Sequence, residues 1–185
     1  MTNNGQFAMF SRILHWTMAA MVLVMLFIGV AMVASLLDYH LLVSIHRPLG
    51  IAILILVVIR YVNRWINPPP PFPASMPPQE RLIAHVSELS MYAMMFALPL
   101  IGWAMLSAAN YPIVLCGSLH LPPILPHNAM LYAFLRKTHT VIAYLFFLTF
   151  IAHFSAILFH TLIMRDHLLD RMLPWKVRRH DAGSI

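Results

Sequence analysis

Four histidines have spacings that could place redox cofactors inside a membrane: His15, His46, His139 and His153. His139 and His153 are 14 residues apart in one apolar run. In a helix this separation is nearly four turns, with a rise of about 21 Å. One helix would therefore present two imidazoles on nearly the same face, at two depths of a bilayer. Ionisable groups inside membrane spans usually face a partner or a cofactor.

The run that holds this pair, residues 138–164, contains no Asp, Glu, Lys or Arg and is 27 residues long. About 20 apolar residues are enough for a helix to cross a bilayer. For any one of its histidines, a hydrogen bond to a neighbouring helix is the alternative explanation. A matched pair at two depths favours cofactor ligation.

The composition of the whole chain indicates an integral membrane protein. Of its 185 residues, 61% are hydrophobic and only 10% are charged, and this predicts membrane-spanning helices in a single domain, residues 1–185. The net charge of +6 comes from residues at the ends of apolar runs, so nucleic-acid binding is not expected. The only cysteine, Cys116, excludes an intrachain disulfide and a multi-cysteine iron–sulfur site.

The apolar runs predict an all-α, four-helix transmembrane bundle. We expect helices at about 12–37, 46–65, 80–108 and 138–164, with the first retained as a helix and not removed as a signal peptide. A stiff proline loop at 67–78 and a long connection at 110–137 separate the later helices. With this topology, nine of the 12 basic residues fall on the side of both termini and three on the other. The positive-inside rule then predicts that both termini are cytoplasmic.

The predicted depth of each histidine in this bundle groups the four histidines into two pairs. His15 lies near the cytoplasmic end of the first helix and matches His153, whereas His46 and His139 both lie near the outer ends of their helices. Each pair could ligate one haem iron through two imidazoles, which leaves no open site for oxygen and favours electron transfer. Zinc needs three or four ligands that converge on one point, and these pairs lie too far apart in depth.

Six stretches of the chain carry a family resemblance: RILHW at 12–16, SIHRPLGI at 44–51, RYVNRWINPPPP at 60–71, AHVSELSMYAMMFALPLIGW at 84–103, KTHTVIAYLFFLTFIAHFSAILFH at 137–160, and DHLLDRMLP at 166–174. In this order they resemble the bacterial cytochrome b561 family of small di-haem cytochromes in the inner membrane. The resemblance covers nearly the whole chain. It implies two b-type haems with the same pairs of axial ligands.

The resemblance also implies quinone chemistry. Members similar to this chain pass electrons from periplasmic superoxide to ubiquinone, and a superoxide:ubiquinone oxidoreductase is the leading expectation. By resemblance, His160 would lie at the quinone site, with Arg81 close by. The proline loop has no lysine, although lysines mark this site in the superoxide-oxidising relative, and Glu88 replaces a second histidine after His85.

Two other functions stay open. One is a haem b subunit that docks on a dehydrogenase or hydrogenase and receives electrons from that redox protein. The other is a haem-free ion carrier. The expected surroundings are membrane lipid, a quinone, and either superoxide or a redox protein as the electron donor, whereas the sequence does not determine the oligomeric state.

Charged and titratable residues near both histidine pairs have further candidate roles. His85 and Glu88 are one helical turn apart and could relay protons, or could form a structural hydrogen bond. Arg47, Arg136 and Lys137 could pair with haem propionates on the outer side or attract an anion. Arg12, Arg60 and Arg64 could bind propionates on the inner side, although the positive-inside rule alone would also explain them.

Overall fold

The computed structural model describes residues 5–34, 38–73, 76–115 and 119–175. Four long helices run through it: α1 (Met9–Ala34), α2 (Tyr39–Ile66), α3 (Pro78–Ala108) and α4 (Ala129–Phe159), the last continued by a π-helical turn, η1 (His160–Met164). Each is long and apolar enough to span a membrane. This confirms the prediction of a four-helix transmembrane bundle.

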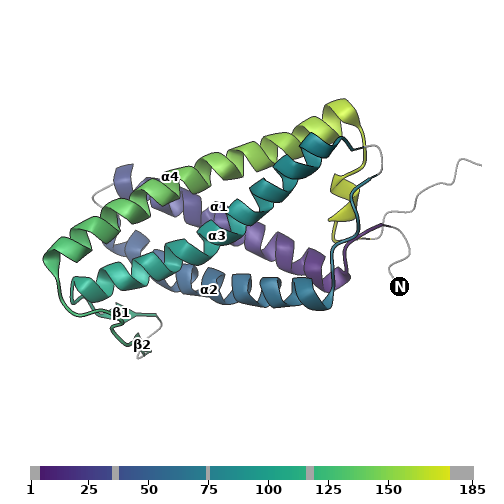
Figure 1. Cartoon of the computed structure of the whole chain (residues 1–185). Coiled ribbons are helices and arrows are strands. Elements are labelled where there is room, and N and C mark those ends of the chain that lie inside the picture. The colour runs from purple at the N-terminus through teal and green to yellow at the C-terminus, as the bar shows by residue number, and fades with distance from the viewer. Residues whose placement is uncertain (1–4, 35–37, 74–75, 116–118, 176–185) are drawn as a thin grey trace, which may run out of the picture.

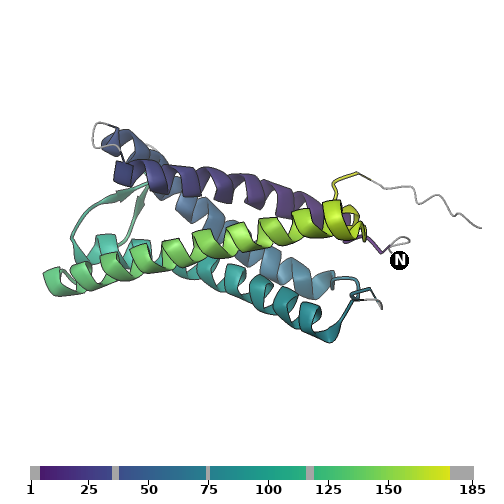
Figure 2. The same cartoon turned by 90° about the horizontal axis from the view of Figure 1, so that it is seen from above.

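The helices form two antiparallel pairs that meet along one seam. Helix α1 packs mainly on α2, α3 mainly on α4, and α2 and α3 join the pairs. Figures 1 and 2 show the beginning of α1 and the end of α4 at the same end of the bundle. We call this the terminal end, and the opposite end, with the strands β1 (Ile113–Val114) and β2 (His120–Leu121), the hairpin end.

Helices α2 and α4 begin earlier than the sequence predicted. Helix α2 starts at Tyr39 and not near 46, and the Leu42 amide donates to the Asp38 carbonyl at 2.9 Å. Helix α4 starts at Ala129 and not near 138, because the Asn128 side chain accepts from the Leu131 amide at 2.9 Å and caps the helix. The sequence predicts a connection that ends at Lys137, whereas in the structure both Arg136 and Lys137 lie within the helix.

The other two helices differ less from expectation. Helix α1 is described from Met9 to Ala34, and the predicted end at 37 lies outside the described residues. Helix α3 starts at Pro78, a residue type suited to a first helical turn, and contains Pro99. The connection after α3 forms the two-stranded antiparallel hairpin β1–β2.

The protein core is a small apolar cluster at mid-bundle, made of Met18, Val22, Ile53, Val57, Met95 and Phe146. Most other large apolar side chains point outward, such as Phe27, which is 68% exposed, and Leu148, which is 64% exposed. An apolar exterior is what lipid requires. Phe146 lies seven residues from both His139 and His153, so the buried cluster separates the two levels at which the histidines lie.

The segment after η1 folds back across the start of α1. A short 3-10 turn, η2 (Leu169–Arg171), leads into it, and the Phe7 amide donates to the Arg171 carbonyl at 3.0 Å. The Trp16 indole donates to the Met172 carbonyl at 2.8 Å, and Arg171 donates to the Pro71 carbonyl of the proline loop at 2.6 Å. These bonds tie α1, the proline loop and the C-terminal segment together at the terminal end.

Candidate functional site

The structure brings His46 and His139 together across the bundle at the hairpin end, with their rings edge-on. His46 comes from the third turn of α2 and His139 from the third turn of α4, and both side chains are half-buried. Their ring centres are 6.3 Å apart, with an angle of 65° between the ring planes. We call these two residues the hairpin pair.

This separation suits a metal ion held between the two rings. A metal–imidazole nitrogen bond is about 2.0–2.1 Å and the ring centre lies about 1.1 Å beyond the nitrogen, so two imidazoles on opposite sides of one metal have ring centres roughly 6.3 Å apart. Among the described residues, none makes a hydrogen bond of ordinary geometry to the buried Nδ1 atom of either histidine. Buried polar atoms normally have partners, so the donor set and its spacing both fit a bis-imidazole haem site.

Helix α3 passes close to the hairpin pair at a glycine. A Cβ atom placed on Gly102 would lie 3.6 Å from Cε1 of His139 and 3.8 Å from its Nδ1. Both distances are ordinary van der Waals contacts, so one methyl group fits, whereas a longer side chain would enter the space of the imidazole. Gly102 therefore lets α3 approach the ring of His139.

His15 and His153 lie near one another toward the terminal end, and we call them the terminal pair. They come from α1 and α4, are half-buried, and are close enough for a charge on one to act on the other. The Trp16 ring lies edge-on to that of His15, with 5.7 Å between ring centres. Among the described residues, no three or more His, Cys, Asp or Glu side chains gather where they could hold one metal ion. Like His46 and His139, His15 and His153 therefore form a pair.

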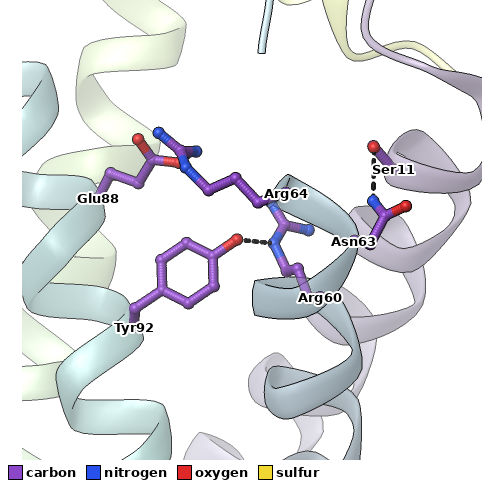
Figure 3. Close-up of polar contacts among 6 residues, drawn as sticks. All are labelled: Ser11, Arg60, Asn63, Arg64, Glu88 and Tyr92. Atoms are coloured by element: carbon purple, nitrogen blue, oxygen red, sulfur yellow. Dashed lines mark hydrogen bonds and ion pairs between the residues drawn. The ribbon is translucent and has the colours of Figure 1, made fainter. Parts of the chain in front are cut away.

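Polar side chains bridge α2 and α3 near the terminal pair (Figure 3). Arg60 Nε donates to the Tyr92 hydroxyl at 2.8 Å, and the guanidinium carbon lies 5.7 Å from the centre of the tyrosine ring. Arg64 forms an ion pair with Glu88. The Asn63 amide donates to the Ser11 hydroxyl at 2.7 Å and so ties α2 to α1.

These bridging residues line an open cleft whose wall also includes Phe7, Asn67, Pro69 and Met172. Of the lining residues, Arg60, Arg64 and Glu88 are candidates from the sequence, whereas Tyr92, Asn63 and Ser11 emerge only from the structure. No spacing rule could have found them, since their partners lie on other helices.

The residues expected near a quinone have other partners in the structure. His160 Nδ1 lies 2.5 Å from an Asp166 carboxylate oxygen, in the π-helical turn that ends α4. Single π-helical turns are frequent at functional sites. Arg81 donates to the Met76 and Pro73 carbonyls at 2.9 and 3.2 Å and so holds the proline loop against α3.

His85 and Glu88, considered above as a proton relay, contact different residues in the structure. His85 is exposed and its ring packs edge-on against Phe72, at 5.0 Å between ring centres, whereas Glu88 faces Arg64. On the opposite side of the bundle, Arg47 is half-buried beside His46, and Arg136 and Lys137 are exposed on α4.

Four membrane-spanning helices with histidine pairs at two levels are typical of transmembrane b-type cytochromes. The sequence model of the family described as prokaryotic cytochrome b561 matches residues 6–175. The chain is 31% identical over 172 residues to cytochrome b561 homolog 2 of Escherichia coli K12, covering 91% of each chain. It is 32% identical over 136 residues to the probable superoxide oxidase CybB of Yersinia pestis, covering 71% of this chain and 74% of that protein.

A third relative, cytochrome b561 homolog 1 of Escherichia coli K12, is 28% identical over 141 residues, which is 74% of this chain and 77% of the relative. The chain belongs to the prokaryotic cytochrome b561 family. It is therefore a b-type haem protein of transmembrane electron transfer and a multi-pass protein of the bacterial inner membrane. The haem-free ion carrier considered from the sequence is wrong, because this family binds haem.

Proposed function

We propose that the chain holds two b-type haems, one on the hairpin pair and one on the terminal pair, and passes electrons between them across the membrane. The observation that carries the proposal is the 6.3 Å separation of the His46 and His139 ring centres, which suits two axial ligands of one iron. We call the two cofactors the hairpin haem and the terminal haem. Each haem would supply a one-electron carrier, held by the two imidazoles of its histidine pair.

The overall reaction we propose is superoxide:ubiquinone oxidoreduction. Two superoxide anions each lose one electron and become dioxygen, and one ubiquinone takes the two electrons and two protons and becomes the quinol. One relative of the chain carries the name of a probable superoxide oxidase, and this supports the choice of donor. Orientation by the positive-inside rule puts the hairpin end in the periplasm, where the donor would arrive, and the terminal end in the cytoplasm.

The residues around the two ends suit this direction of transfer. Arg47, Arg136 and Lys137 give the hairpin end a positive charge that would attract an anion such as superoxide. At the terminal end, the His160–Asp166 pair could hand a proton to a reduced quinone, since the two side chains share a close contact at the membrane edge. Arg81 would act there only through the loop that it holds in place.

The test is superoxide loss and ubiquinone reduction by purified, haem-loaded protein in detergent or liposomes. We expect quinone-dependent loss of superoxide that falls to the level of a haem-free control when His46→Ala removes the hairpin haem. The matched control is His40→Ala, an exposed histidine near the start of the same helix.

Haem-loaded protein that neither consumes superoxide nor reduces quinone would contradict the proposal. It would favour the alternative in which a dehydrogenase or another redox protein supplies the electrons. In that case a donor protein should co-purify with the chain in a fixed ratio.

A further inference from the structure

Three arginines gather near the terminal pair, and they differ in what neutralises them. Arg64 has its own carboxylate, Glu88. Arg12 and Arg60 come from α1 and α2, and within the residues that the structure describes neither forms an ion pair with a carboxylate. Two guanidinium groups at this level of the bundle therefore lack an anion from the described protein.

For Arg12 the lack of a counter-ion is energetically unfavourable, because its side chain is buried. It is only 5% exposed, and its Nη1 donates to the Leu173 and Trp175 carbonyls at 2.8 and 3.1 Å. Its Nε is buried and has no hydrogen-bond partner among the residues that the structure describes. A buried charge without a counter-ion is strongly unfavourable, so a buried arginine calls for an anion. The unpartnered Nε is a donor available to it.

Both arginines lie beside the terminal pair. Arg12 precedes His15 by three residues, so it lies on a neighbouring position of the same helix face, about 4.5 Å nearer the terminal end. Arg60 is close enough to both His15 and His153 for its charge to act on them. The Asn63–Ser11 hydrogen bond holds α1 and α2 together at this level.

We propose that Arg12 and Arg60 bind the two propionate carboxylates of the terminal haem, and that Tyr92 is a positioning residue that orients Arg60. The inference rests on the part of the proposed function that assigns His15 and His153 to one haem. A b-type haem carries two carboxylates, which matches two guanidinium groups without a carboxylate of their own. Arginine is well suited to carboxylates because its planar fork can donate two parallel hydrogen bonds.

Tyr92 acts on Arg60 through two contacts. Its hydroxyl accepts from Nε at 2.8 Å, and its ring lies under the guanidinium group, 5.7 Å from the guanidinium carbon. Because Nε is engaged, the two terminal nitrogens are the atoms that can reach a carboxylate. Figure 3 shows Arg60 and Tyr92 reaching toward one another from α2 and α3, beside the Arg64–Glu88 pair.

The charges make a measurable prediction for the reduction potential. Reduction adds an electron to the haem, so a nearby guanidinium favours the reduced state. Removing Arg12 or Arg60 should lower the midpoint potential of the terminal haem and leave the hairpin haem unchanged. We expect at least a tenfold change in the ratio of reduced to oxidised terminal haem at fixed potential, which is 59 mV for a one-electron couple.

The experiment is an optical redox titration of the full-length, haem-loaded protein with Arg12→Gln, Arg60→Gln and Tyr92→Phe. His153→Ala identifies which spectral component is the terminal haem. Arg165→Gln is the matched control, because Arg165 is exposed beyond η1 and its replacement removes one positive charge from the same end of the bundle. Resonance Raman spectra of the propionate bending band give a second readout that a merely structural role would not move.

A lower potential for the terminal haem alone in Arg12→Gln and Arg60→Gln, with a shifted propionate band and a smaller shift in Tyr92→Phe, would support the proposal. Unchanged potentials and an unchanged band with both haems retained would overturn it, as would an equal shift in Arg165→Gln. If a glutamine variant loses haem, Arg60→Lys and Tyr92→Phe decide by the same criterion. A wild-type protein with fewer than two haems would instead contradict the proposed function.

Discussion

At the scale of residues, the two histidine pairs lie in different environments. The hairpin pair joins α2 to α4 with its rings edge-on, and both Nδ1 atoms are buried without a hydrogen bond of ordinary geometry to any described residue. The terminal pair lies among charged groups, with Arg60 acting on both imidazoles and Glu88 acting on that of His153. Charge near a haem and hydrogen bonds to its ligands tune the reduction potential. If each pair holds one haem, as we propose, the two haems should therefore differ in potential.

The histidine pairing predicts which substitutions remove the same haem. His15→Ala and His153→Ala should each lower the haem content from two per chain to one and leave the same spectrum. His46→Ala and His139→Ala should leave the other spectrum. Haem content per chain and the reduced-minus-oxidised spectrum are the measurements. If His15→Ala and His46→Ala leave identical spectra, the pairing is wrong.

Gly102 offers a test of the hairpin site that leaves its ligands in place. Gly102→Ala should retain both haems, because the added Cβ would make only van der Waals contact with His139. Gly102→Leu should displace the imidazole and lower the content of the hairpin haem. Gly29→Leu is the control, since a Cβ at Gly29 meets nothing within 4 Å. Full haem content in Gly102→Leu would show that His139 does not hold the haem where we place it.

At the scale of elements, the four helices must meet two requirements at once. Their outer faces must be apolar for lipid, and their inner faces must hold polar ligands at two levels. The buried cluster at mid-bundle meets both demands, because Met18, Val22, Ile53 and Phe146 pack between the two histidine levels. Because this cluster holds the bundle together, the helices can lie farther apart at the two histidine levels, where cofactors would bind.

Phe146 is the member of this cluster whose loss should cost most. It is 4% exposed and is the only residue of α4 classed as buried among those described. Phe146→Ala should lower the free energy of unfolding by about 3 kcal/mol through lost contacts and a cavity. Phe147→Ala is the control, because the neighbouring ring is 41% exposed. Unfolding in mixed detergent, followed by circular dichroism, measures the difference, and equal losses in both variants would contradict the role of Phe146.

At the scale of the whole molecule, both described ends of the chain lie on one side, joined by hydrogen bonds from α1 to the C-terminal segment. Nine basic residues belong to that side of the predicted topology and three to the other. The charge asymmetry favours a cytoplasmic terminal end. The electron transfer that we propose, from the periplasm to a quinone near the cytoplasmic face, requires this orientation.

Fusion reporters test the orientation directly. Green fluorescent protein fused to the C-terminus should fluoresce, and alkaline phosphatase at the same position should be inactive, because the phosphatase matures only in the periplasm. Phosphatase fused after Pro126, in the connection between β2 and α4, should be active and serves as the internal control. The reverse pattern would place the terminal end in the periplasm and would exclude the proposed direction of electron transfer.

The amino-acid sequence alone predicts the number of helices, the membrane setting and the family, because apolar runs of sufficient length and ordered local motifs are visible along the chain. It also placed candidate ligands at two depths, since the rise of a helix is constant. It missed the start of α4 at Ala129, because the Asn128 cap lies in a proline-rich connection ahead of two charged residues.

Which side chains meet between helices is visible only in the folded chain. The Tyr92–Arg60 contact, the Ser11–Asn63 bond and the Arg64–Glu88 pair join residues that lie 24 to 52 positions apart. Helix periodicity predicts which residues share a face of one helix. It does not predict how that helix is rotated relative to its neighbours. The buried state of Arg12, on which the propionate proposal depends, follows from the C-terminal segment that folds across α1.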